Sequence, residues 1–212
     1  MSIKLEDIRE NLLKMASLTE KSLNYCTNEE VSIAEHRNLE NEINSFHKLI
    51  DDECYKFIAL QQPMARDLRE VISIMKINSD LERVGDQSVN IKRTASYLRN
   101  MHPLLSTLQE EVQHMIHSAI DALVQTNTML SVDVIKTDET INNLHRSIIK
   151  SYIKLMKENN IDFDEAYNVI QISKNFERVG DHAKNIAEDI IFIDIGKDIR
   201  HGSNHEIFDQ NK

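Results

Sequence analysis

Glycine, proline and tryptophan are scarce in this sequence, whose 212 residues include 4 Gly, 2 Pro and no Trp. Strands and tight turns call for more Gly, Pro and aromatic residues, so this scarcity argues against β-structure. Apolar residues make up 41% of the chain and charged residues 28%. No apolar run approaches the roughly 18 residues that a membrane-spanning helix needs. We therefore expect an all-α protein with a sizeable core and no transmembrane segment.

A net positive charge is also lacking, because 35 Asp and Glu outnumber 25 Lys and Arg and give a formal net charge of -10. Binding to nucleic-acid phosphates requires a basic surface, so that class of function is disfavoured. The two cysteines, Cys26 and Cys54, form no CxxC motif and fall in apolar-periodic segments, which predicts buried thiols. Met1–Arg9 alternates charge and is followed by no apolar stretch, which argues against a signal peptide and favours the cytoplasm.

Catalytic motifs are missing as well. The sequence contains no G-x-x-x-x-G-K, G-x-S-x-G or H-E-x-x-H. Glu111 and His114 form a single Glu-x-x-His, whereas a di-iron bundle enzyme needs two on facing helices. We therefore predict a protein that is not an enzyme.

One short phrase occurs twice, as Leu81–Asp86 (LERVGD) and as Phe176–Asp181 (FERVGD). Over twelve residues, Asp80–Ile91 and Asn175–Ile186, seven positions are identical, at an offset of 95 residues. An internal repeat of this kind predicts two similar halves.

Apolar spacing of three and four residues predicts three amphipathic helices in each half, the first over about Leu5–Tyr25 and the third over about Ala65–Asn100. Pro63 should interrupt the second helix, and Gly196 should end the sixth as a C-terminal cap. Thr27 and Glu30 have capping-box spacing, so we place the second helix start there, and we place a turn at Ser131–Asp133. The fold class is therefore all-α, with two tandem three-helix bundles. The predicted divisions are 1–101 for the first bundle, 102–197 for the second, and 198–212 for a polar tail, of which 201–212 is expected to be mobile.

The repeated phrase carries an unusual pair of acids in each half, Glu82 with Asp86 and Glu177 with Asp181. Like charges four apart on a helix repel at a cost of about 0.2–0.5 kcal/mol. A helical wheel places these acids away from the apolar stripe, so they are not expected to be core residues.

A second acidic motif precedes each of these pairs. Glu40 and Asn44 flank Ile43 in the second helix, and Asp138 and Asn142 flank Ile141 in the fifth. If each helix pair forms an antiparallel hairpin, three carboxylates and one amide gather in each half. Such oxygen-rich groups suit Mg²⁺, Mn²⁺, Ca²⁺ or iron.

These residues resemble the PhoU family of regulators of bacterial phosphate uptake. The repeated Glu-x-x-x-Asp within Glu-Arg-Val-Gly-Asp matches the family signature, and Leu60–Arg69 is similar to its Gln-Gln-Pro…Asp-Leu-Arg segment. The resemblance implies two three-helix bundles and metal ions, such as Fe, Zn, Mg or Mn, on the acidic motifs. It also implies a cytoplasmic protein, often a homodimer, that links the ATPase subunit of the phosphate ABC transporter to a sensor histidine kinase, regulates phosphate homeostasis and so affects transcription indirectly.

The sequence departs from the family pattern at Asn44 and Asn142, where the family often has Asp, which predicts weaker metal sites. Asp67 could add a ligand in the first half. Two alternatives remain open: a helical adaptor whose acidic faces dock basic partners without metal, and a paralogue attached to another transporter. The predicted metal ligands are Glu40, Asn44, Asp67, Glu82, Asp86, Asp138, Asn142, Glu177 and Asp181.

Overall fold

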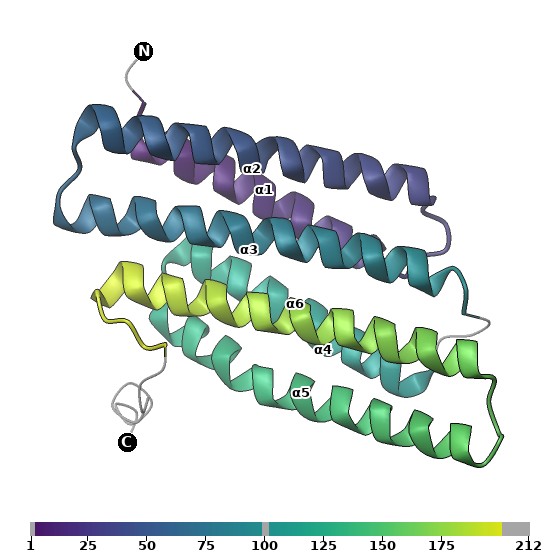
Figure 1. Cartoon of the computed structure of the whole chain (residues 1–212). Helices are drawn as coiled ribbons and strands as arrows, with labels where there is room; N and C mark the ends of the chain where they lie inside the picture. Colours follow the sequence, from purple (N-terminus) through teal and green to yellow (C-terminus); the bar gives the residue numbers. More distant parts are fainter. Residues whose placement is uncertain (1–2, 99–101, 201–212) are drawn as a thin grey trace, which may run out of the picture.

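A computed structural model, which describes residues 3–98 and 102–200, contains six α-helices and no strand within those residues (Figure 1). The predicted all-α fold class is confirmed. The helices are α1 (Leu5–Tyr25), α2 (Ile33–Gln61), α3 (Ala65–Ala95), α4 (Pro103–Gln125), α5 (Thr128–Lys157) and α6 (Phe163–Ile195).

The first three helices pack on one another, and so do the last three, which gives the two predicted bundles. The most extensive contact in the molecule joins α3 and α6, the third helix of each bundle, which lie side by side through its centre (Figure 1). Helices α1 and α4 add a smaller contact between the bundles. One apolar core runs through both halves, from Ile8 and Leu12 to Phe176 and Ile190, all at 0% exposure.

Two predicted helix boundaries are wrong. The capping box is at Ser32 and Glu35, not at Thr27 and Glu30, because a connection at Cys26–Ser32 separates α1 from α2. The turn predicted at Ser131–Asp133 lies inside α5, whose N-cap is Asn127. The polar residues Ser131 and Asp133 suggested a turn, but Ser131 is buried within the helix and donates a hydrogen bond to Asn127 O.

Other boundaries agree with the sequence. The first helix spans Leu5–Tyr25 as predicted, α2 ends at Gln61 before Pro63, and Gly196 in the left-handed conformation (φ 71°) ends α6. The predicted end of the third helix at Asn100 and the tail at 201–212 lie outside the described residues. Both cysteines are buried free thiols, and burial raises the pKa of each to about 12. No helix in the described ranges combines the length and apolar character needed to span a membrane.

Candidate functional site

Each half brings its two acidic motifs together across a helix pair, as the sequence predicts. In the first half, Glu40 of α2 faces Glu82 and Asp86 of α3, and we call these residues the first acidic face. Burial, followed by repulsion from Asp86 and then from Glu82, raises the pKa of Glu40, while Arg37 opposes the rise. Asp86 and Glu82 are therefore close enough to Glu40 to disfavour ionisation of its carboxyl group.

The second acidic face consists of Asp138 on α5 with Glu177 and Asp181 on α6. The carboxyl of Asp181 reaches the surface, yet packing around it removes water and, with the charges of Glu177 and Asp138, raises its pKa. Asp138 is 7% exposed, and its Oδ1 accepts no hydrogen bond. The two faces thus have the same construction, on helix pairs that correspond between the halves.

Glycine makes this close approach of helices possible. A Cβ built on Gly85 would lie 3.2 Å from Ile43 Cδ1, and one on Gly180 would lie 3.2 Å from Ile141 Cδ1. These isoleucines belong to the two motifs that carry Glu40 and Asp138. The glycine between the two acids of each phrase therefore lets the helix that carries the partner motif pack close to those acids.

The acids are less exposed than the helical wheel suggested. Glu82 and Asp86 are partly buried, and the side chain of Glu177 is 14% exposed. Arg83 and Arg178, between the acids, take the solvent-facing positions instead. The reason is tertiary, because α3 and α6 are each packed against several helices and so have a narrow solvent face.

Lysines distinguish the second face from the first. Lys174 Nζ lies 2.5 Å from Glu177 Oε2, and Lys184 Nζ lies 3.0 Å from Asp138 Oδ2. Burial lowers the pKa of Lys184, but its hydrogen bond and ion pair with Asp138 raise it by more. The matching positions of the first half, 95 residues earlier, are Ser79 and Val89. The second face therefore carries its own counter-charges, whereas Arg37 is the base that acts on Glu40 in the first.

Of the remaining predicted ligands, the two asparagines lie beside the acidic faces and Asp67 lies apart from them. Asn142 Nδ2 donates to Asp138 Oδ2 at 3.2 Å, so it joins the second face, and Asn44 occupies the corresponding place one turn after Glu40. Asp67 is exposed in the first turn of α3, fifteen residues before Glu82, which is roughly 22 Å along the helix. The structure does not bring Asp67 to the first face. Within residues 3–98 and 102–200, no group of three or more His, Cys, Asp or Glu side chains has the arrangement of a ready metal site.

Sequence reasoning missed a histidine that extends each motif. His47 lies seven residues after Glu40, and His145 lies seven after Asp138. His145 Nδ1 is 2.9 Å from Ser173 Oγ; burial lowers its pKa, whereas the charge of Glu177 opposes that effect. His47 Nδ1 is buried without a hydrogen-bond partner. The common spacing of acid, Asn and His in the two helices was a signal that a comparison of the halves could have found.

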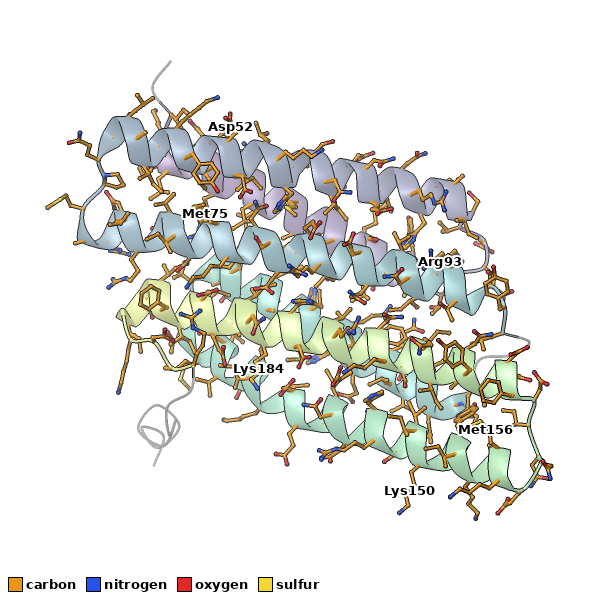
Figure 2. The ribbon with its side chains drawn as sticks, viewed as in Figure 1. Asp52, Met75, Arg93, Lys150, Met156 and Lys184 are labelled. Atoms are coloured by element: carbon orange, nitrogen blue, oxygen red, sulfur yellow. The ribbon has the colours of Figure 1, made fainter. Side chains whose placement is uncertain are left out.

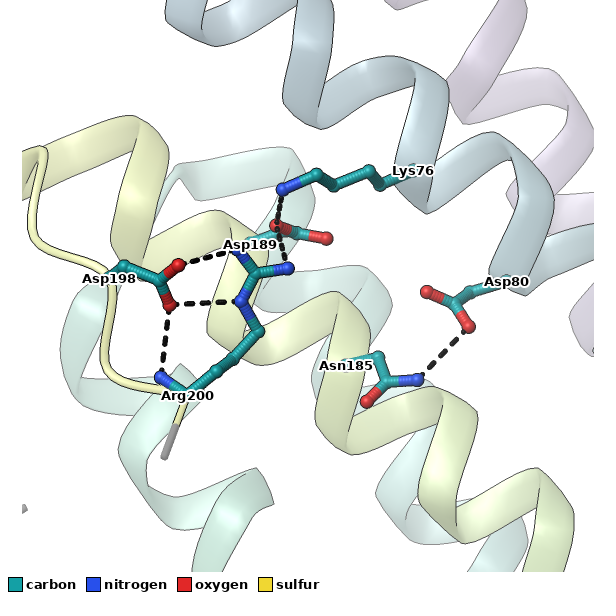
Figure 3. Close-up of polar contacts among 6 residues, drawn as sticks. All are labelled: Lys76, Asp80, Asn185, Asp189, Asp198 and Arg200. Carbon is teal, nitrogen blue, oxygen red and sulfur yellow. Dashed lines mark hydrogen bonds and ion pairs between the residues drawn. The ribbon is translucent and has the colours of Figure 1, made fainter. Parts of the chain in front are cut away.

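His182, the residue that follows Asp181, contacts the first bundle. Its side chain is 17% exposed, and Nδ1 lies 2.7 Å from Asp80 Oδ1 on α3. Asn185 Nδ2 donates to the same oxygen at 3.2 Å (Figure 3). These residues therefore connect the two bundles.

The fold and the two faces define a class: a duplicated three-helix-bundle protein with one acidic face in each half. The family model described as PhoU domain matches the chain twice, at residues 5–95 and 105–190. The chain belongs to the PhoU family.

Named relatives agree over most of the chain. A protein of Pseudomonas aeruginosa named phosphate-specific transport system accessory protein PhoU homolog is 33% identical, over 93% of this chain and 86% of that protein. The Escherichia coli (strain K12) protein named phosphate-specific transport system accessory protein PhoU is 29% identical, over 96% of this chain and 88% of that protein.

Two solved structures have the same fold as this chain. The crystal structure of PhoU from Pseudomonas aeruginosa superposes with a TM-score of 0.86 at 31% identity, covering 91% of this chain and 98% of that one. PhoU from Streptococcus pneumoniae has the same fold, with a TM-score of 0.83 at 24% identity, over 92% of this chain and 97% of that one.

Proposed function

We propose that this chain is a non-enzymatic regulator of phosphate uptake that acts in the cytoplasm as a homodimer. It would link the ATPase subunit of the phosphate ABC transporter to a sensor histidine kinase. Membership of the family supports this proposal, as do relatives at about 30% identity whose names describe phosphate transport accessory proteins. The observation that carries it is the match of both halves to the family's domain.

Metal binding on the acidic faces is the second part of the proposal. Glu40, Glu82 and Asp86 repel one another, and a bound cation would remove that repulsion. The unpartnered Oδ1 of Asp138 is a donor available in the second half. Carboxylate and amide oxygens fit Mg²⁺, Mn²⁺ or iron, and His47 and His145 would widen the choice to Zn²⁺.

The two faces should differ in affinity. An ion at the second face must displace Lys174 and Lys184, whereas an ion at the first face displaces neither. We infer that the first face binds metal more tightly. At the second face, the lysines already neutralise part of the acidic charge, so this face depends less on a bound cation.

Deletion of the gene in the source organism tests the phosphate role. Without the protein, alkaline phosphatase activity and phosphate uptake should stay high when phosphate is plentiful. Expression of the intact chain should restore repression. Normal repression in the deletion strain would contradict the proposed role and leave a paralogue of another transport system.

Metal analysis of untagged protein tests the proposed metal binding on the acidic faces. Loading with Mn²⁺ and measuring bound metal should show that Glu82→Ala reduces the content more than Glu177→Ala. Asp133→Ala, which removes an exposed acid of α5, is the matched control and should change nothing. Lys184→Ala should increase binding at the second face. If no metal binds under any loading condition, the adaptor alternative replaces the metal proposal.

A further inference from the structure

A half-enclosed cavity of about 400 Å³ lies at one end of the first bundle, between the α1–α2 connection and the end of α3. It is outside both acidic faces, and its chemistry is mixed. Hydroxyl groups of Thr27, Ser32 and Ser96 line part of it, and Val31, Ala95 and Leu98 provide apolar walls. Glu29, an exposed residue, also borders the cavity.

The unusual residue of this cavity is Lys92, which is 8% exposed. Its Nζ donates a hydrogen bond to the carbonyl oxygen of Asn28. Among the described residues, no acidic side chain forms an ion pair with it. An ammonium group taken out of water without a carboxylate partner normally costs several kcal/mol. Lys92 therefore lines the cavity with an ammonium group whose hydrogen-bond partner in the described chain is a neutral carbonyl oxygen.

The charge of Lys92 acts on the groups around it. Burial raises the pKa of Cys26 to about 12, and the nearby Lys92 opposes that rise. Burial lowers the pKa of His36, the hydrogen bond to Ser22 opposes this, and Lys92 lowers it further. The ammonium group of Lys92 is thus close enough to Cys26 and His36 to affect both of them.

The fold itself does not require this lysine. Ile91 corresponds to Ile186 in the repeat, so Lys92 corresponds to Ala187, which is 0% exposed. The second bundle packs its helices with alanine there, and a connection of only two residues, Thr126 and Asn127, joins α4 to α5. The lysine and the longer connection that forms the cavity are both particular to the first half.

We propose that this cavity binds a small anion with a short apolar body, of the carboxylate or phosphate-monoester class. The ammonium group of Lys92 pairs with the anionic head, and the hydroxyl of Thr27 adds a hydrogen bond. Val31, Ala95 and Leu98 contact the apolar part. The site does not depend on the phosphate role proposed above.

Calorimetric titration of the full chain at low salt tests this assignment. The probes are butyl phosphate and pentanoate, with butylammonium as the oppositely charged control. At least one of the two anions should bind, and butylammonium should not; the tighter anion identifies the head group. Lys92→Met should weaken binding at least tenfold. Arg93→Met removes the same charge from the exposed neighbour (Figure 2) and should leave binding within about twofold of the original.

A structural role for Lys92, as a tie between α3 and the α1–α2 connection, predicts different results. In that case neither anion binds the original chain, and the proposal is overturned. Ala95→Leu provides a second check, because it narrows the cavity and keeps Lys92. It should weaken binding several-fold without altering the circular dichroism spectrum; unchanged affinity in this variant would place the anion elsewhere and also overturn the proposal.

Discussion

Gly85 and Gly180 each pack against one isoleucine side chain of the neighbouring helix, Ile43 or Ile141. Alanine is favoured over glycine within a helix by about 1 kcal/mol. Here, however, the added Cβ would press on Ile43 or Ile141, which are 1% and 0% exposed and have little room to move. Packing opposes helix propensity at both sites.

We expect Gly85→Ala to lower the free energy of unfolding by about 1–2 kcal/mol, because overpacking outweighs the gain in propensity. Urea denaturation measures this change. Ile43→Val removes Cδ1, the closest atom, and should recover part of the loss in the double variant. Rescue of Gly180→Ala by Ile141→Val should be poorer, since Cγ2 also lies 3.2 Å from the added Cβ. Equal rescue in the two halves would contradict this account.

Glu40 provides a pH-dependent test of the first acidic face. Its pKa is raised in the folded protein, so its protonated form is favoured by folding, and that stability is lost as pH rises through the folded pKa. At pH 7, Glu40→Gln should therefore raise stability, by about 0.5 kcal/mol for one relieved repulsion, or about 1–2 °C in Tm. Thermal unfolding followed by circular dichroism measures it.

The gain from Glu40→Gln should disappear below the unfolded pKa of Glu, near pH 4, where the original side chain is protonated. Millimolar Mg²⁺ at pH 7 should also reduce it, if cations bind the first face. Glu42→Gln, which removes an exposed charge of the same helix, is the control. A gain that persists at pH 3 would show that repulsion is not its cause.

The start of α2 is decided by side-chain hydrogen bonds at the helix terminus. Ser32 Oγ accepts from Glu35 N at 3.1 Å, and Glu35 Oε2 accepts from Ser32 N at 2.9 Å. The sequence contains a second pair with the same spacing, Thr27 and Glu30, and both pairs satisfy the sequence pattern. The structure uses the later pair, after a connection that the apolar periodicity does not reveal.

Ser32→Ala should reduce the free energy of unfolding by about 1 kcal/mol, the usual cost of removing an N-cap, and so lower Tm by about 2–4 °C. Thr27→Ala is the matched control, since Thr27 caps no helix, and it should change Tm by less than 1 °C by the general rule for such surface sites. Differential scanning calorimetry of the two variants distinguishes the two candidate caps. A larger effect at Thr27 would contradict the assigned boundary.

At the scale of the whole molecule, charged groups connect the two bundles along α3 and α6. Asp189 is 3% exposed, and its Oδ1 lies 3.3 Å from Lys76 Nζ and 3.9 Å from Arg200 Nη1 (Figure 3). Burial raises the pKa of Asp189, while Lys76 opposes the rise. Asp80, His182 and Asn185 make a second set of contacts one to two turns away. A buried carboxylate in such a position stabilises the contact between the bundles only while Lys76 and Arg200 balance its charge.

Asp189→Ala should lower the free energy of unfolding by about 1–3 kcal/mol, because it leaves Lys76 without its partner between the bundles. A double-mutant cycle with Lys76→Ala, measured by urea denaturation, should give a coupling of at least 0.5 kcal/mol. Glu139→Ala, which removes an exposed carboxylate of α5, is the control. Additive effects of Asp189→Ala and Lys76→Ala would show that this ion pair contributes nothing to the contact between the bundles.

The sequence by itself determined the class of fold and the duplication. Periodicity is a local property, so Leu5–Tyr25 and the end of α2 before Pro63 could be predicted from residues close in the chain. The repeated phrase and its partner motifs also indicated which acids converge, because helices joined by short connections pack as antiparallel neighbours. The cap at Ser32 and the start of α5 were missed, since several polar residues offered equally good local signals.

The tertiary structure alone decided how the two acidic faces differ. Lys174 and Lys184 come from α6, and Lys184 reaches a carboxylate on another helix, which no local pattern specifies. The packing around α3 and α6 leaves Glu82, Asp86 and Glu177 partly buried and places His182 against Asp80. The cavity at Lys92 likewise exists only because the α1–α2 connection folds over the end of α3. Burial and pairing of charges depend on contacts between distant segments, and these are absent from any single stretch of sequence.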